Sequence, residues 1–311
     1  MFTLEFAYMR LHFKARGHLR LPPYKGSTFR GAFGVAFKRA VCIVQHGECE
    51  RCLVRTQCVY PYVFDTPVEN AQGIFRGYQE APHPYLIEPP LETKTDYAPG
   101  EEFAIGQTLI GRALNYMPYF IYTFQRMGDT GIGRGRGKCD LISGEALHAD
   151  GTWQEVYDGA SEMLQQDVPH LTAQDLMHKE IGSQIRLSFV TPTQLKADRI
   201  LQRGLDFPVL IRGLLRRYSA LAAFHADGPP DLNYADYISA AENIQTTSHN
   251  LTWRTWERYS NRKNRRMSVS GFTGDVVFEG DMTQFHPLLA LGVPMHVGKW
   301  TSFGMGQYAL I

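Results

Sequence analysis

The sequence predicts an α+β protein that folds as two domains in tandem. Its 311 residues are enough for two domains that each bury a core, and 44% hydrophobic with 20% charged residues is typical of a globular chain. The order helix, glycine-rich loop, strand occurs twice, over residues 111–146 and again over residues 285–308. This repeat indicates two ferredoxin-like βαββαβ units, residues 1–180 and 184–311, with a cysteine-rich insertion in the first.

Composition excludes some classes of protein. The formal net charge is only +1, so any nucleic-acid partner must be bound by local basic patches. The sequence contains no run of about 18 apolar residues that would predict a membrane span. Its N-terminal residues lack the pattern of a secretion signal. We therefore expect a cytoplasmic protein with no membrane partner. Five cysteines in such a protein argue against a disulfide scaffold.

The first half opens with a strand, a turn and a helix. Residues 2–13 show the alternation of a half-buried strand, and a proline-containing turn follows at residues 21–26. Ser27 is the predicted cap of a helix over residues 28–41. The buried stripe of this helix is expected to comprise Phe29, Ala32, Phe33, Ala36 and Phe37.

Four cysteines follow that helix in the pattern C-x6-C-x2-C-x5-C: Cys42, Cys49, Cys52 and Cys58. A C-x2-C pair bends back to present two thiolates to one metal ion, and two further cysteines complete a tetrahedral site. We therefore predict a structural zinc ion. The alternatives are an iron–sulfur cluster and a group of reduced thiols without metal. His46 lies among the cysteines and is a possible zinc ligand as well.

The rest of the first half contains a second helix and a basic loop. Residues 85–88 and 103–110 have the pattern of strands, and residues 111–126 that of a helix which Pro118 should kink. The loop G-I-G-R-G-R-G-K leads into a strand over residues 139–146. Its cations suit phosphate contacts, the alternative being an exposed loop that binds nothing. The RNA-binding residues predicted here are Arg134, Arg136 and Lys138.

The second half begins after a polar connection over residues 159–182. An alternating strand is expected at residues 184–190 and helices at residues 207–223 and 234–244. The first of these helices carries three arginines that we assign to a solvated face: Arg212, Arg216 and Arg217.

The strongest basic patch of the sequence lies between residues 253 and 267. Trp253, Trp256 and Tyr259 are interleaved with cations, which suits base stacking together with phosphate contacts. The alternative is a charged surface hairpin. The cations predicted to bind RNA are Arg254, Arg258, Arg262, Lys263, Arg265 and Arg266.

The chain end combines a strand near residues 276–278, a short helix after Pro287 and a glycine-rich loop over residues 298–306. Lys299 and Ser302 in that loop are predicted to contact RNA phosphates together with backbone N–H groups. The simpler alternative is a turn that only closes a sheet.

These motifs resemble one known family. The pattern G-x-x-G-x-x-x-F, a short helix, and H-x-G-K-x-T-S-F-G-x-G-x-Y at the chain end are similar to the CRISPR-associated RAMP-superfamily endoribonucleases that process precursor CRISPR RNA. The opening strand, L-P-P-x-x-G turn and R-G-A-F-G helix resemble the start of the same proteins. The resemblance implies binding of CRISPR repeat RNA and cleavage without a catalytic metal. The 2′-hydroxyl would attack the adjacent phosphate and leave a 2′,3′-cyclic phosphate.

The resemblance also implies a catalytic set. Family members place a tyrosine before the first helix and a histidine and a lysine at or near its end, which here correspond to Tyr24, His46 and Lys38. The reserve histidines are His18, His286 and His296. One alternative function is a non-catalytic RAMP subunit that binds guide RNA within a CRISPR effector complex. A second is a zinc-stabilised structural protein that uses the cysteines for a protein contact.

Overall fold

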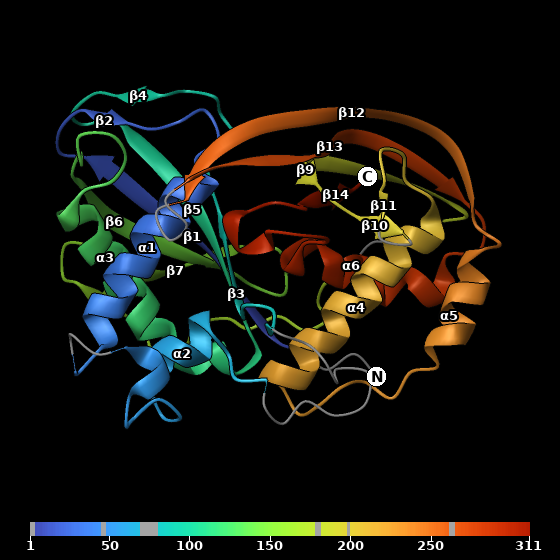
Figure 1. The fold of residues 1–311 in the computed structure, drawn as a ribbon, viewed down its shortest axis with the longest axis horizontal. Coiled ribbons are helices and arrows are strands. Elements are labelled where there is room, and N and C mark those ends of the chain that lie inside the picture. Colours follow the sequence, from blue (N-terminus) through green and yellow to red (C-terminus); the bar gives the residue numbers. More distant parts are fainter. Residues whose placement is uncertain (1–3, 45–47, 69–79, 178–181, 198–199, 261–264) are drawn as a thin grey trace. The chain divides into compact units, whose positions relative to one another are not determined.

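The computed structural model describes residues 4–44, 48–68, 80–177, 182–197, 200–260 and 265–311 (Figure 1). The chain forms two compact units. The N-terminal unit comprises Leu4–Leu171 together with Ala220–Gly228, and the C-terminal unit comprises Thr172–Ser219 and Pro229–Ile311. Both units combine helices with a β-sheet, so the predicted α+β class is confirmed.

The N-terminal unit contains a six-stranded antiparallel sheet in the order β3-β5-β1-β6-β7-β8. Its strands are β1 (Phe6–Ala15), β3 (Tyr85–Glu88), β5 (Glu102–Ile110), β6 (Cys139–Leu147), β7 (Trp153–Asp158) and β8 (Met163–Leu164). A small second sheet pairs β2 (Leu19–Arg20) with β4 (Asp96–Tyr97). The helices are α1 (Gly26–Val41), α2 (Val59–Phe64) and α3 (Met117–Thr130), with 3-10 turns at Cys49–Arg51 and Gly111–Tyr116.

Aromatic side chains form the core of this unit. The predicted stripe of α1 is largely confirmed, because Phe29, Phe33 and Phe37 are completely buried. The Phe33 ring lies 4.8 Å from that of Phe124 on α3, and the Phe29 ring lies 5.9 Å from that of Phe103 on β5. Burial of one such side chain stabilises a fold by about 1.5–3 kcal/mol. The stripe therefore fixes α1, and the residues at both of its ends, against the sheet.

The helix predicted over residues 111–126 begins later than expected. A 3-10 turn covers Gly111–Tyr116, and α3 then starts at Met117, so Pro118 lies in its first turn. The predicted kink at Pro118 is wrong, because the missing N–H of proline costs no hydrogen bond in the first turn of a helix.

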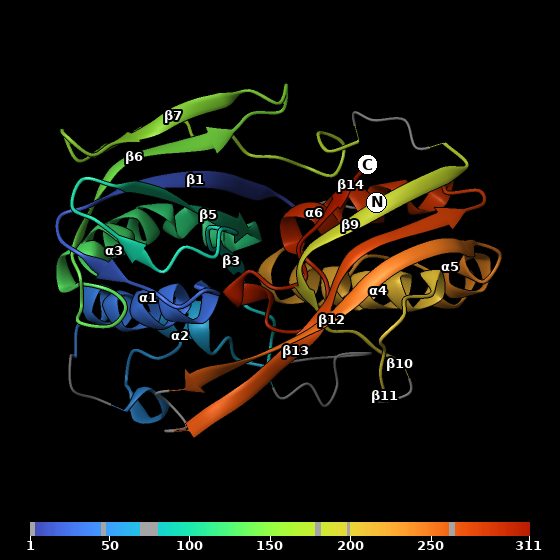
Figure 2. The ribbon, with the colours of Figure 1, turned by 90° about the horizontal axis from the view of Figure 1, so that it is seen from above.

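The C-terminal unit contains a four-stranded antiparallel sheet in the order β12-β13-β9-β14. Its strands are β9 (Gln184–Thr193), β12 (Gln245–Ser260), β13 (Arg265–Glu279) and β14 (Tyr308–Leu310), and β10 (Lys196–Ala197) pairs with β11 (Ile200–Leu201). The helices are α4 (Phe207–His225), α5 (Tyr234–Ala241) and α6 (His286–Met295), with 3-10 turns at Thr283–Phe285 and Thr301–Phe303. Figure 2 shows β12 and β13 running side by side as one long hairpin.

Helix α4 begins in the C-terminal unit, and its last residues belong to the N-terminal unit. In the part of the chain that the structure describes, no helix is both long enough and apolar enough to span a bilayer.

Candidate nucleic-acid interface

The first glycine-rich loop, residues 131–138, is anchored to the segment that precedes α1. The N–H of Arg134 donates to the carbonyl of Arg20 at 2.9 Å, and the N–H of Ile132 donates to the carbonyl of Gly137 at 2.9 Å. A Cβ at Gly133 would collide with the carbonyl oxygen of Arg20. Glycine at this position is therefore required for the close approach of the two backbones.

The cations of this loop are accessible. Arg134, Arg136 and Lys138 all have exposed side chains. Arg136 has a φ of 51°, so the chain turns sharply at the centre of the loop. The N–H of Arg16 donates to the carbonyl of Lys138 at 2.9 Å, which places the basic segment after β1 beside the loop. These contacts gather several cations onto one face of the N-terminal unit.

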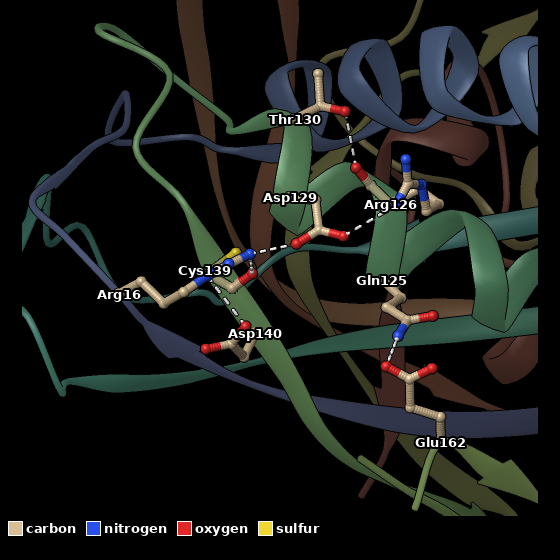
Figure 3. Close-up of polar contacts among 8 residues, drawn as sticks. All are labelled: Arg16, Gln125, Arg126, Asp129, Thr130, Cys139, Asp140 and Glu162. Carbon is tan, nitrogen blue, oxygen red and sulfur yellow. Dashed lines mark hydrogen bonds and ion pairs between the residues drawn. The ribbon is translucent and has the colours of Figure 1, made fainter. Parts of the chain in front are cut away.

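Arg16 holds the two ends of the loop together (Figure 3). Its Nη2 atom lies 2.5 Å from Oδ1 of Asp129, before the loop, and its Nε atom lies 3.0 Å from Oδ1 of Asp140, after the loop. The hydrogen bond to Asp129 raises the pKa of Arg16. Because these side chains are exposed, such ion pairs stabilise the protein by only about 0–1 kcal/mol each. Their main effect is to fix the base of the loop.

The second glycine-rich loop, residues 298–306, lies on the end of β9. The N–H of Lys299 donates to the carbonyl of Gln194 at 3.3 Å, and the N–H of Gly306 donates to the carbonyl of Pro192 at 3.1 Å. Lys299 is exposed, whereas Ser302 is only 6% exposed. Lys299 is therefore accessible to a phosphate, and the hydroxyl of Ser302 is largely shielded.

Lys299 lies in a cluster of positive charges. Partial burial of the ammonium group, together with the nearby charges of Lys196 and Arg216, lowers the pKa of Lys299. Three cations at close range repel one another, and a phosphate group would relieve that repulsion. Lys196 could not be predicted from the sequence, because the fold brings it near Lys299 through the hydrogen bond between the N–H of Lys299 and the carbonyl of Gln194.

The prediction of a solvated face is wrong for Arg217. Arg212 and Arg216 are exposed, but the guanidinium of Arg217 is buried and its Nε donates to the carbonyl of Met295 at 2.5 Å. Among the described residues, its Nη2 atom has no hydrogen-bond partner. Burial lowers the pKa of Arg217 to about 9, so the group is still charged at neutral pH. A buried positive charge thus lies next to the chain that enters the second loop.

The basic patch between residues 253 and 267 forms the distal part of the β12–β13 hairpin. Arg254 is exposed, and the guanidinium carbon of Arg203 lies 5.6 Å from the centroid of the Trp253 ring. Arg262 and Lys263 lie outside the described residues. For the other three predicted cations, Arg258, Arg265 and Arg266, the structure describes the backbone. Each of them pairs with a residue of the opposite strand of the hairpin. A hairpin was the alternative expectation for this patch, and it is compatible with RNA binding.

Helix α1 packs on α2 through two cations. The guanidinium carbon of Arg30 lies 4.7 Å from the centroid of the Phe64 ring, and Nζ of Lys38 lies 5.6 Å from that of the Tyr60 ring. Arg30 Nη2 also lies 3.3 Å from Nε2 of His83. Sequence reasoning missed His83, because only the fold brings it to a helix 53 residues earlier.

Tyr24 lies in a different environment from Lys38. Its pKa is raised by burial and by the nearby Glu88 carboxylate, which also accepts a hydrogen bond of 2.7 Å from the hydroxyl of Tyr8. Tyr24 therefore keeps its proton at neutral pH and cannot act as a base there. The polar cluster around Glu88 was not predicted, because its residues come from three distant segments.

The structure does not bring the expected catalytic set together. Tyr24 precedes α1 and Lys38 is in its last turn, and the helix from Gly26 to Lys38 is about 18 Å long at 1.5 Å per residue. His46 lies outside the described residues. Of the reserve histidines, His296 is buried, with Nδ1 3.0 Å from the carbonyl of Met305.

The four clustered cysteines line a single cavity. All are half-buried, and tight turns bring the last three together, since the N–H of Cys52 lies 3.3 Å from the carbonyl of Cys49 and that of Cys58 lies 3.4 Å from the carbonyl of Arg55. Every cysteine is a free thiol. Within the described ranges, no three His, Cys, Asp or Glu side chains already form a group that could hold a metal. The predicted zinc site is therefore not preformed.

Two family models match the chain. Residues 4–169 match a family described as an N-terminal domain, AF_1859_N, and residues 187–308 match the CRISPR-associated endoribonuclease Cas6 family. The chain belongs to the AF_1859_N family, whose model matches more than half of it, and its C-terminal part is similar to the CRISPR-associated Cas6 endoribonucleases. The resemblance noted at both ends of the sequence is confirmed. The Cas6 match over residues 187–308 supports CRISPR RNA processing in general for this Cas6-like chain.

Whole-chain comparisons identify a relative and show the fold. An uncharacterized protein of Archaeoglobus fulgidus is 23% identical over 99% of both chains. A solved Cas6 product complex has a TM-score of 0.60 at 14% identity, covering 98% of this chain and 100% of the other. Thermus thermophilus Cas6 has a TM-score of 0.54 at 13% identity, covering 99% of both. At such low identity, the structural matches show that the Cas6-like chain shares the Cas6 fold.

Proposed function

We propose that the chain binds CRISPR repeat RNA and cuts it without a catalytic metal. The 2′-hydroxyl attacks the adjacent phosphate, the bond to the 5′ oxygen breaks, and the products carry a 2′,3′-cyclic phosphate and a 5′-hydroxyl. The observation that carries this proposal is the pair of cationic glycine-rich loops, each tied to its own unit by backbone hydrogen bonds. Rigid loops that display cations are suited to an RNA backbone.

Each unit contributes its own surface for the RNA backbone in this proposal. Arg134, Arg136 and Lys138 contact phosphates from the N-terminal unit, and Lys299 does so from the C-terminal unit with Lys196 and Arg216 beside it. The cations of the β12–β13 hairpin extend the second surface, beginning with the exposed Arg254. The near-zero net charge of the chain is no obstacle, because counterion release depends on local phosphate contacts.

Three chemical tasks must be met at the cut bond. A base takes the 2′ proton, an acid protonates the leaving 5′ oxygen, and a cation stabilises the charge on the phosphorane. We assign the cation to Lys38. His46 is the base that family resemblance supports. The structure supports His83 as the alternative base, because its ring lies beside Arg30, which is on the same helix as Lys38. Tyr24 donates a hydrogen bond only if the RNA reaches the opposite end of α1.

A second candidate is a RAMP subunit that binds guide RNA without cutting it. The separation of Tyr24 from Lys38 favours this candidate, because a catalytic set must converge on one phosphate. The two candidates share the same RNA-binding surfaces, so only cleavage distinguishes them.

We also infer that both units are ferredoxin-like. If β2, α2 and β4 are set aside, the N-terminal unit has the order β1-α1-β3-β5-α3-β6, with β1 between β5 and β6 in the sheet and β7 and β8 added after β6. The C-terminal unit has β9-α4-β12-β13-α6-β14, with β10 and β11 added before α4 and α5 added after it, and β9 lies between β13 and β14. This common βαββαβ order supports the tandem repeat expected from the sequence.

The decisive experiment incubates the full chain with CRISPR repeat RNA, with and without Mg²⁺ and EDTA. Matched RNAs carry a single 2′-deoxy nucleotide at each position in turn. We expect one cut that is insensitive to EDTA, leaves a cyclic phosphate and is abolished by one deoxy substitution. His46→Ala and His83→Asn variants, assayed in parallel, identify the base. Tight binding with no cut at any position would instead establish the guide-binding subunit.

A further inference from the structure

We propose that Cys42, Cys49, Cys52 and Cys58 bind one zinc ion as four thiolates, and that this ion ties the end of α1 to the start of α2. The proposal is independent of whether the chain cuts RNA. It begins from the cavity that all four cysteines line, together with Tyr60 and Pro61.

The exposure of the side chains between Cys42 and Cys58 indicates that this segment needs a further source of stability. Several of its apolar side chains are exposed, with Ile43 80% and Leu53 101% exposed, and the turn Cys49–Arg51 has no buried residue. The four cysteines, by contrast, are all half-buried. Ile43, Val44 and Val54 line the same cavity as the thiols, but none of the described residues between Cys42 and Cys58 is fully buried. The described part of this segment therefore has no hydrophobic core of its own. Such segments are normally stabilised by a metal or by disulfides.

The backbone carries the cysteines to the ends of two helices. The N–H of Cys42 donates to the carbonyl of Lys38 at 3.0 Å at the end of α1, and the N–H of Tyr62 lies 3.4 Å from the carbonyl of Cys58 at the start of α2. Both helices pack into the aromatic core. The backbone positions of the first and last proposed ligands, Cys42 and Cys58, are therefore already fixed. Cys49 and Cys52 lie on one tight turn between them and complete the set.

The ligand chemistry favours zinc. Four sulfur ligands with a C-x2-C pair are typical of closed tetrahedral zinc sites, which have no open position and so are structural. Binding displaces the thiol protons to solvent, and thus the final arrangement forms only with the metal present. Such coupling is consistent with four thiols that line one cavity while, among the residues that the structure describes, no preformed group could hold an ion.

The first test measures metal content in the full chain purified under reducing conditions and dialysed against a trace of Zn²⁺. Mass spectrometry of the metals should give about one zinc per chain. Cys52→Ser should remove most of that zinc. Cys139→Ala is the matched control, because Cys139 is a free thiol buried on β6, and this variant should retain about one zinc.

A second test needs no variant and remains valid if Cys52→Ser fails to fold. The wild-type chain is treated with an alkylating reagent before and after zinc is removed by a chelator, and the modified cysteines are mapped by peptide mass spectrometry. The four clustered cysteines should be protected before removal and react after it. Zinc far below one per chain, unchanged reactivity after chelation, or iron with acid-labile sulfide in place of zinc would each overturn the proposal.

Discussion

The Nζ atom of Lys38 lies 5.6 Å from the centroid of the Tyr60 ring. Lys38 comes four residues before Cys42 and Tyr60 comes two residues after Cys58, so this pair spans both ends of the cysteine segment. The face of Tyr60 attracts the ammonium group by about 0.5–1 kcal/mol at such a partly exposed site. The position of the proposed catalytic cation therefore depends on the packing of α2.

Replacement of Lys38 should impair cleavage more than binding. Lys38→Ala removes the cation assigned to the phosphorane, and we expect the single-turnover rate to fall by roughly 10²–10³-fold with little change in RNA affinity. Lys94→Ala is the matched control, because Lys94 Nζ lies 4.9 Å from the Tyr97 ring in an equivalent lysine–tyrosine pair. A Lys38→Ala rate within about twofold of wild type would remove Lys38 from the mechanism.

Loss of the cations in the first loop should weaken RNA binding in a salt-dependent way. Each lost phosphate contact lowers the slope of log affinity against log salt by about 0.7–1. The triple variant Arg134→Ala, Arg136→Ala, Lys138→Ala should therefore lower the slope by roughly two to three. Arg126→Ala, which breaks an ion pair with Asp129 on α3, is a control of equal charge per site. An unchanged slope in the triple variant would place the RNA elsewhere.

Two glycines of the same loop should respond differently to alanine. Gly133 has a φ of 70° and its added Cβ would meet the Arg20 carbonyl, whereas Gly135 has a φ of 85° with nothing near it. Gly135→Ala should cost only the left-handed backbone strain of about 1 kcal/mol. Gly133→Ala should cost more than about 2 kcal/mol, since the clash adds to the strain. Urea unfolding of both variants checks the difference, and equal losses would show that the loop can move off β2.

RNA affinity should fall with rising pH because of Lys299. Burial and two neighbouring cations lower the pKa of Lys299, so this group loses its proton at a lower pH than an ordinary lysine. A bound phosphate favours the charged form, hence binding is strongest below that pKa and weakens as the pH rises through it. Lys299→Arg keeps its charge, so it should flatten the pH profile of the dissociation constant above neutral pH. Profiles that coincide for the two proteins would exclude a contact at Lys299.

The sequence predicted the elements whose periodicity is simple. Residues 85–88 were predicted as a strand with the bounds that β3 has, and the phenylalanine stripe of α1 identified its buried face. Strand β7 was missed because its burial does not alternate, although the turn at Asp150 and Gly151 before it was a usable signal for a hairpin.

The candidate site was only partly predictable, for a physical reason. Glycine loops and cation runs are local in sequence, so the positions of Arg134 and Lys299 followed from motifs alone. The contact between Arg30 and His83, and the burial of Arg217 against the carbonyl of Met295, depend on tertiary packing. Helical spacing could not assign Arg217 to a buried position while its neighbour Arg216 is exposed.

The end of helix α4 determines which fragments of the gene can encode a whole N-terminal unit. Its final turn belongs to the N-terminal unit, where Nε2 of His225 lies 2.7 Å from the carbonyl of Pro82 and Nδ1 lies 3.3 Å from the hydroxyl of Tyr62. A gene fragment that ends at residue 180 would encode an N-terminal unit without this turn. Such a fragment would lack the contacts that His225 makes with Pro82 and Tyr62, so the N-terminal unit is not one continuous stretch of the gene.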